Sequence, residues 1–283
     1  MSDWLDPPIS AVRDVVARAL AEDLGTLGDL TAGLVPPDAR VHAALVSRRE
    51  GVLAGRLSAT EAFRAVDPGI AVAWEVADGD RLAPGTSIAA IEGLLSSVLT
   101  AERTVLNLLG HLSGVATLTR AYADAAGSRC RIRDTRKTTP GLRALEKAAV
   151  RAGGGANHRG SLSEGILVKD NHLAGLTIAE AVARAHQRWP GQPVEVECDH
   201  LSQVDEAVAA GAELILVDNM TPEEVAEAVA RIGGRVPVEV SGGVGLADVA
   251  AYAAAGADLI SVGALTHSAP VFDIGLDLVQ EAG

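Results

Sequence analysis

Residues 194–243 read VEVECDHLSQVDEAVAAGAELILVDNMTPEEVAEAVARIGGRVPVEVSGG, and this stretch decides the fold. In it, short runs rich in valine, isoleucine and leucine alternate with alanine-rich stretches of helical periodicity. The runs begin at residues 194, 214 and 236, and another begins at residue 259, so the unit repeats about every 20 residues. Regular alternation of strands with helices indicates a parallel sheet, because parallel strands need a crossover connection between them.

The same alternation extends back to Gly127. We predict six strands, over 131–134, 166–169, 194–198, 214–218, 236–240 and 259–262. We predict helices between them, over 142–152, 178–188, 201–210, 222–231 and 246–255. Such a sheet can close into a barrel or stay open and doubly wound. Polar residues or glycine recur at the strand ends, and this favours the barrel, because a barrel brings those ends to one mouth.

The N-terminal part of the chain has a different pattern, which predicts a separate domain. Residues 41–55 and 70–91 have the composition of strands and hairpins with Gly and Pro turns. Helices are predicted over 9–23 and over 100–126, where Thr100 begins an imperfect capping box.

Composition limits the function classes. The chain has 283 residues and 48% apolar residues, which is ordinary for a globular protein, and its formal net charge is −13. An acidic exterior repels a phosphate backbone and gains little at an anionic membrane, so neither nucleic-acid nor membrane partners are expected. The start MSDWLDPP does not resemble a secretory signal, and we expect a cytoplasmic protein. Cys130 and Cys198 show no metal-binding spacing and are expected to be free, buried thiols.

One basic segment stands out within this acidic chain. Residues 129–169 hold ten Lys and Arg against three Asp and Glu, a balance of +7, and they contain all three lysines of the chain, Lys137, Lys147 and Lys169. A local basic pocket in an acidic body indicates a small, highly charged anion as ligand. The alternative is a solvated, charged helix face between residues 143 and 151.

Several residues of this segment have the chemistry to bind an anion. Arg136 and Lys137 follow the first predicted barrel strand, and His158 and Arg159 follow three glycines that let the backbone approach a ligand closely. Lys169 stands at a strand end, where a buried ammonium needs an anion. Each of these residues could instead form a structural ion pair, but as a set they indicate a ligand with several negative groups.

The later strands end in acids and glycines. Glu197 and Asp218 end consecutive strands, where carboxylates suit Mg²⁺ or ribose hydroxyls, although structural acids are also common there. The last two strands lead into SGGVG at 241–245 and VGALTH at 262–267. Loops in these places of α/β barrels often hold a phosphate through backbone N–H groups, although glycines also serve tight turns.

The motifs of the chain, taken in order, resemble those of the quinolinate phosphoribosyltransferases, in the type II phosphoribosyltransferase family. They are GDLT (28–31), AERTVLNLLGHLSGVAT (101–117), RDTRKTTPGLR (133–143), GGGANHR (153–159), VKDNH (168–172), EVEC (195–198), LVDN (216–219), SGG (241–243) and VGALTH (262–267). The resemblance covers nearly the whole chain. It implies an N-terminal α/β sandwich domain over 1–113, an incomplete, seven-stranded α/β barrel over 114–270, and a tail over 271–283 that returns to the first domain.

The resemblance also implies the site. Substrate contacts are expected from Arg103, Thr135, Arg136, Lys137, His158, Arg159, Lys169, Glu197, Asp218, Ser241, Gly242, Gly243, Gly263, Ala264 and His267. Of these, Lys137, Glu197 and Asp218 are expected to be catalytic, and Glu197 and Asp218 are expected to hold Mg²⁺, directly or through water. Arg103 is expected to reach the site of a neighbouring subunit in a homodimer, or in dimers assembled into a hexamer.

The implied reaction joins quinolinate to phosphoribosyl pyrophosphate and gives nicotinate mononucleotide, pyrophosphate and CO₂, a step of NAD biosynthesis. Three alternatives remain at this point. The chain could be a related phosphoribosyltransferase that acts on nicotinate or another acidic heterocycle, or a phosphate-binding barrel without turnover. Lys169 at a strand end also permits a lyase that works through a Schiff base.

Overall fold

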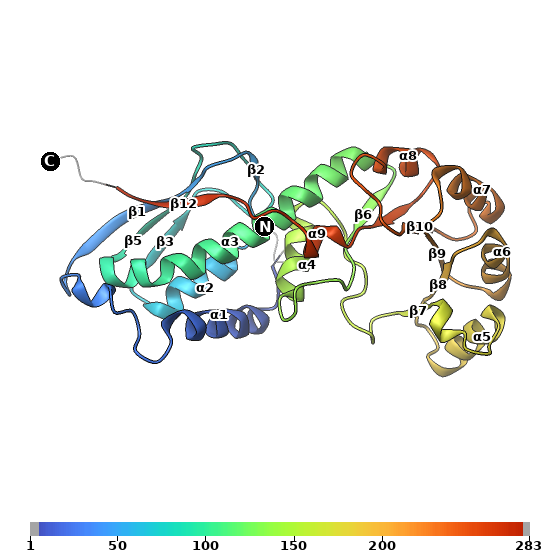
Figure 1. Cartoon of the computed structure of the whole chain (residues 1–283), viewed down its shortest axis with the longest axis horizontal. Helices are drawn as coiled ribbons and strands as arrows, with labels where there is room; N and C mark the ends of the chain where they lie inside the picture. Colours follow the sequence, from blue (N-terminus) through green and yellow to red (C-terminus); the bar gives the residue numbers. More distant parts are fainter. Residues whose placement is uncertain (1–5, 280–283) are drawn as a thin grey trace. The chain divides into compact units, whose positions relative to one another are not determined.

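A computed structural model of the chain describes residues 6–279, which form two compact units (Figure 1). The first unit contains the chain up to Arg120, Thr138–Gly154 and the chain from Leu265 onward, and the second contains Ala121–Lys137 and Gly155–Ala264. Within residues 6–279, no helix combines the length and the apolar character that crossing a membrane would require.

The second unit is built on a parallel sheet of six strands in the order β6-β11-β10-β9-β8-β7. Its strands are β6 (Arg131–Arg133), β7 (Ile166–Val168), β8 (Val194–Cys198), β9 (Leu214–Asp218), β10 (Val238–Ser241) and β11 (Leu259–Ser261). Its helices are the single turn η2 (Asp170–His172), α5 (Ile178–Arg188), α6 (Leu201–Ala210), α7 (Pro222–Ile232) and α8 (Val249–Ala254). The α/β class and the parallel sheet are therefore confirmed.

The sheet is an incomplete barrel with β6 and β7 at its two ends. A further parallel bridge joins Arg133 to Ala156, whose N–H donates to Ile132 O at 2.8 Å. Seven strands were expected from the resemblance, and the structure forms six with this bridge in the place of the seventh. The three glycines before Ala156 leave too little extended chain there for a longer strand.

Local sequence signals explain why the helices of this unit begin and end where they do. Thr177 caps α5 in a box with Glu180, and Thr221 caps α7 in the same way with Pro222 as its first residue. Both α6 and α7 end at a glycine in the left-handed region, where a residue without Cβ is favoured. The predicted bounds of α5, α6, β8 and β9 agree with the structure to the residue.

The first unit contains an antiparallel sheet in the order β12-β1-β5-β3 and a pair β2-β4. Its strands are β1 (Arg40–Ser47), β2 (Gly51–Val52), β3 (Ala71–Trp74), β4 (Arg81–Leu82), β5 (Ser87–Leu94) and β12 (Ile274–Leu278). Its helical elements are α1 (Ile9–Leu24), η1 (Ala32–Leu34), α2 (Arg56–Val66), the first part of α3 (Leu95–Ala126), α4 (Arg143–Ala152) and α9 (Ala264–His267). The C-terminal strand β12 pairs with β1, so the tail up to residue 279 returns to this sheet.

Two sequence predictions in this unit are wrong. Helix α3 begins at Leu95, and Thr100 lies inside it, where its hydroxyl donates to Asp29 at 2.9 Å instead of capping the helix. The capping signal was misleading, because a threonine hydroxyl can donate to a nearby carboxylate instead of accepting a backbone N–H at the start of a helix. Helix α2 was not predicted, and it begins after Gly55, which has φ +103°. The predicted domain boundary at residue 113 falls inside α3 and stays a prediction.

The charged face predicted as an alternative for residues 143–151 is also wrong in part. Glu146 is fully buried and Lys147 is only 7% exposed. Glu146 accepts the N–H of Thr139 at 3.1 Å and contacts His111 at 2.8 Å, so it anchors the segment before α4 to α3. A solvated helix face therefore does not account for this charge.

Candidate active site

The predicted site residues of the second unit lie at the carboxyl ends of its strands. Lys169 follows β7, Glu197 is the fourth residue of β8, and Asp218 and Ser241 are the last residues of β9 and β10. Asp218 and Ser241 are also partners in the sheet register. Because parallel strands direct their carboxyl ends to one edge, these side chains converge there, as predicted from the sequence.

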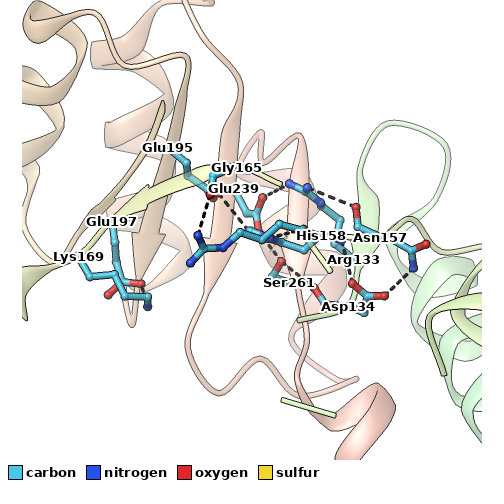
Figure 2. Close-up of polar contacts among 11 residues, drawn as sticks. Arg133, Asp134, Asn157, His158, Gly165, Lys169, Glu195, Glu197, Glu239 and Ser261 are labelled. Carbon is cyan, nitrogen blue, oxygen red and sulfur yellow. Dashed lines mark hydrogen bonds and ion pairs between the residues drawn. The ribbon is translucent and has the colours of Figure 1, made fainter. Parts of the chain in front are cut away.

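Lys169 and Glu197 contact each other across neighbouring strands (Figure 2). The Lys169 ammonium donates to Glu197 Oε2, and the two side chains are 40% and 12% exposed. A Schiff base requires the lysine nitrogen to reach a carbonyl carbon, and here the Lys169 nitrogen contacts a carboxylate on the neighbouring strand. This contact therefore weighs against the Schiff-base alternative.

Arg159 is the most desolvated of the predicted arginines and lies near a second guanidinium. Its Nη1 donates to Gly165 O at 2.8 Å. Burial lowers the pKa of the Arg159 guanidinium, the positive charge of Arg136 lowers it further, and Glu195 acts in the opposite direction. A partly buried guanidinium whose charge is disfavoured by burial and by a like charge favours the binding of an anion.

The loop that carries Arg136 follows β6. Thr135 is half-buried, and its Oγ1 accepts the N–H of Lys137 at 3.0 Å, which shapes the turn. Arg136 and Lys137 are exposed. The side chains predicted to bind substrate therefore belong to a loop that is anchored at Thr135 and reaches into solvent beyond it.

The glycines in the loop after β10 are explained by backbone packing as well as by their predicted part in phosphate binding. Asn219 N donates to Ser241 O at 3.0 Å, and Gly242 has φ +97°. A Cβ on Gly242 would lie 2.3 Å from Asn219 Oδ1 and 2.6 Å from Asn219 N, which no side chain can tolerate. Gly243 has φ +62° and open space around it, and Gly263 and Ala264 follow β11 at the same edge.

Arg103 and His267 belong to the first unit and not to this cluster. Arg103 is exposed on α3. His267 ends α9, and its Nδ1 contacts Ser268 Oγ at 2.6 Å. Their predicted part in the site stays a prediction.

A buried polar network that the sequence did not predict lies within the same sheet (Figure 2). Arg133 Nη1 donates to Glu239 Oε2 at 2.5 Å, and Ser261 Oγ donates to Glu239 Oε1. His158 Nε2 lies 3.1 Å from Glu195 Oε2 and 3.7 Å from Glu239 Oε1. Burial raises the pKa of Glu239, and the charge of Glu195 raises it further.

The sequence did contain a signal for this network. Glu195 and Glu239 occupy the middle of the two VEV runs in β8 and β10, between valines that are buried. Strands of a parallel sheet are usually apolar throughout, so a glutamate between two buried valines must face a polar interior. Arg133 completes the pairing from β6, which is two strands from β10 in the sheet. It lies 106 positions from Glu239, and a contact over such a separation cannot be predicted from one sequence.

Two sets of carboxylates are candidates for a metal. Glu197 and Asp218 are half-buried at the ends of neighbouring strands and offer only oxygen atoms, which fits Mg²⁺, because this ion takes one or two carboxylates together with water and phosphate. The described residues also bring ligand atoms of His158, Glu195 and Glu239 within 4.8 Å of one another.

A groove of about 830 Å³ lies along β7 and α5 in the second unit. Leu162, Val168, Ala185 and Trp189 are among its lining residues, and its basic lining residues are Arg159, His172, Arg184 and Arg188. The rest of this lining is mainly apolar, which suits an anion with several charges less well than the strand ends do. The strand ends described above remain the candidate site.

Comparisons with known proteins agree on one family. Residues 29–113 and 115–277 match the family descriptions "Quinolinate phosphoribosyl transferase, N-terminal domain" and "C-terminal domain". A carboxylating nicotinate-nucleotide pyrophosphorylase of Mycobacterium leprae is 45% identical over 282 residues, covering 96% of this chain and 99% of that protein. A decarboxylating quinolinate phosphoribosyltransferase of Nicotiana tabacum is 37% identical, covering 97% and 84%. The solved nicotinate-nucleotide pyrophosphorylase of Francisella tularensis has a TM-score of 0.93 at 37% identity, covering 97% and 98%.

Proposed function

The chain belongs to the quinolinate phosphoribosyltransferase family, and from this we propose that it transfers the phosphoribosyl group of phosphoribosyl pyrophosphate to quinolinate. The reaction loses CO₂ and gives nicotinate mononucleotide and pyrophosphate. The observation that carries the proposal is the partly buried guanidinium of Arg159, whose pKa is lowered first by burial and then by the positive charge of Arg136. A dicarboxylate is the ligand that relieves this repulsion.

In the proposed complex, Arg159 and Arg136 bind the two carboxylates of quinolinate. Charge-assisted hydrogen bonds of this kind are worth about 1.5–3 kcal/mol each. Nicotinate has only one carboxylate and leaves one of the two guanidinium groups without its partner. We therefore favour quinolinate over other acidic heterocycles as the substrate.

The sugar substrate is proposed to lie over β8–β11. Glu197 and Asp218 accept the ribose hydroxyls and hold Mg²⁺, which neutralises charge on the departing pyrophosphate when it is bound. The backbone at Ser241–Gly243 and at Gly263 and Ala264 receives the 5-phosphate. The glycines support this role, because Gly242 lets the backbone lie directly against Asn219 and Gly243 has open space around it.

The chemistry needs no strong base. The pyridine nitrogen of quinolinate has a free lone pair, so the residues contribute by positioning the two substrates and stabilising the leaving pyrophosphate, where Lys137 supplies positive charge. After the nitrogen is alkylated, its positive charge accepts the electron pair of the bond to the 2-carboxylate, and CO₂ leaves. The half-exposed Lys169 pairs with the Glu197 carboxylate and holds it at the strand ends, where the ribose hydroxyls are proposed to bind.

The proposal extends to the assembly. We propose a homodimer in which Arg103 of one subunit reaches the barrel mouth of the other, with assembly to a hexamer left to measurement. What supports it is that Arg103 is exposed on α3 and lies within the motif AERT that led to the family. A cytoplasmic location stays a prediction.

The test is a product assay with the purified protein, quinolinate, phosphoribosyl pyrophosphate and Mg²⁺. We expect CO₂, pyrophosphate and nicotinate mononucleotide in equal amounts, loss of turnover in Lys137→Ala, and a strong preference over nicotinate. Binding of phosphoribosyl pyrophosphate without any product would support the non-catalytic barrel instead. Product from nicotinate at the same rate would support the related transferase.

A further inference from the structure

Asn219 combines a left-handed backbone with a contact to a carboxylate of the proposed sugar site. It directly follows Asp218 at the end of β9 and has φ +56°. Among residues 6–279, it is the only residue other than glycine in the left-handed region. A side chain makes this conformation less favourable, and a glycine would adopt it without that cost. The turn alone would therefore be served by glycine, and the asparagine adds a side-chain amide.

The amide of Asn219 holds the Asp218 side chain. Its Nδ2 donates to Asp218 Oδ2 at 2.6 Å. This bond restricts rotation of the carboxylate, whose second oxygen, Oδ1, can then accept a hydroxyl or bind Mg²⁺ from a fixed position. A binding group that is held before its ligand arrives loses less freedom when it binds.

The backbone of Asn219 holds the neighbouring glycine loop. Its N–H donates to the carbonyl oxygen of Ser241, which is the register partner of Asp218, at 3.0 Å. Gly242 lies directly against the same residue, because a Cβ on Gly242 would lie 2.3 Å from Asn219 Oδ1. Asn219 therefore contacts both Asp218 and the loop that we propose to receive the 5-phosphate.

The connection that carries Asn219 is short and anchored. Only residues 219–221 separate the end of β9 from the start of α7. Met220 is buried, and its carbonyl oxygen accepts the hydroxyl of Tyr252 at 3.0 Å. Thr221 caps α7. The backbone is thus fixed on both sides of the exposed Asn219 side chain, which is the arrangement that presents an amide at a defined place.

We propose that Asn219 is a positioning residue that joins the ribose end and the phosphate end of the phosphoribosyl pyrophosphate site. Its amide holds Asp218 for the ribose hydroxyls, and its backbone holds the loop over residues 241–243 for the 5-phosphate. The inference rests on the proposed function, because that function supplies the ligands of Asp218 and of the loop. Asn219 acts through these groups and not by binding substrate itself.

Two substitutions separate the amide from the backbone conformation. Asn219→Gly keeps the left-handed φ and the N–H bond to Ser241, and it removes the bond to Asp218. Asn219→Ala is the matched control, because it removes the same amide and also disfavours the left-handed region. We expect Asn219→Gly to melt near the temperature of the wild type and Asn219→Ala to melt clearly lower. Equal melting temperatures of the two variants would contradict the role given to the backbone.

Binding of phosphoribosyl pyrophosphate with Mg²⁺, measured by isothermal titration calorimetry without quinolinate, tests the amide. Asn219→Gly should weaken this binding roughly three- to tenfold, which is the effect of one hydrogen bond. In steady-state kinetics, the KM for quinolinate should stay within about twofold of the wild type. If Asn219→Gly binds phosphoribosyl pyrophosphate as tightly as the wild type does, the residue serves the turn alone and the proposal is wrong.

A double-mutant cycle with Asp218→Ala tests whether the amide acts through the carboxylate. Once Asp218 is removed, Asn219→Gly should change the dissociation constant, or kcat/KM for phosphoribosyl pyrophosphate, by less than about twofold. The same three- to tenfold loss in both backgrounds would mean that the amide binds substrate directly, and it would overturn the proposal.

The calorimetry also separates this inference from the proposed function. If the wild type binds phosphoribosyl pyrophosphate and the cycle behaves as expected, but no product forms with quinolinate, the proposed function fails and the role of Asn219 stands. If the wild type forms product and the cycle shows no coupling between Asn219 and Asp218, the inference fails and the proposed function stands.

Discussion

Replacing Arg159 by glutamine tests whether the two guanidinium groups exist to bind an anion. The change removes one charge-assisted contact to a substrate carboxylate, which is worth about 1.5–3 kcal/mol. A loss of that size lowers kcat/KM for quinolinate by roughly 10- to 150-fold. The same change relieves the repulsion from Arg136 and the desolvation of the guanidinium. It forfeits the bond to Gly165 O, so we expect the free energy of unfolding to change by less than about 1 kcal/mol.

The assay is steady-state kinetics with each substrate varied in turn, together with urea unfolding. The KM for quinolinate should rise while the KM for phosphoribosyl pyrophosphate changes little. Arg184→Gln is the matched control, because it removes the same charge from the exposed face of α5. The reasoning is refuted if the control loses as much as Arg159→Gln, or if Arg159→Gln keeps its kcat/KM for quinolinate within about twofold.

Two further predictions concern the glycine loop and the thiols. Gly242→Ala places a Cβ 2.3 Å from Asn219 Oδ1 at φ +97°, so the free energy of unfolding should fall by about 2 kcal/mol or more, and the affinity for phosphoribosyl pyrophosphate should fall as well. Gly243→Ala has open space around it and should lose only about 1 kcal/mol of stability. Equal melting temperatures of the two variants would contradict this prediction. Burial raises the pKa of the Cys130 thiol to about 11 and that of the Cys198 thiol to about 12. A thiol reagent at pH 8 should therefore label neither cysteine in the native protein and both cysteines in urea. Rapid labelling of the native protein at pH 8 would contradict this prediction.

The sequence predicts the repeating part of the fold well, for reasons that are local. Helix α5 is capped by Thr177 and Glu180, and β8 is a short valine-rich run bounded by Pro193 and by the turn after Cys198. Each signal acts within a few residues, and no distant contact overrides it. The start of α3 could not be predicted in this way, because the Thr100 hydroxyl does not cap the helix but donates to Asp29, 71 positions away.

In the site, too, the features set by local sequence could be predicted and those set by distant contacts could not. Lys169, Glu197 and Asp218 could be assigned to the mouth because each stands at a strand end. What each side chain contacts could not be assigned, because the pairing of Lys169 with Glu197 depends on which strands become neighbours. The contacts of His158 were missed for the same reason, since its acceptor Glu195 lies in the interior of a strand.

A crystal structure with quinolinate bound tests the central claim most directly. The account predicts one carboxylate of quinolinate at about 2.7–3.2 Å from the guanidinium of Arg159 and the other beside Arg136, with the ring nitrogen directed toward Glu197 and Asp218. Quinolinate in the apolar groove along α5, or bound at the strand ends without contact to either arginine, would contradict it.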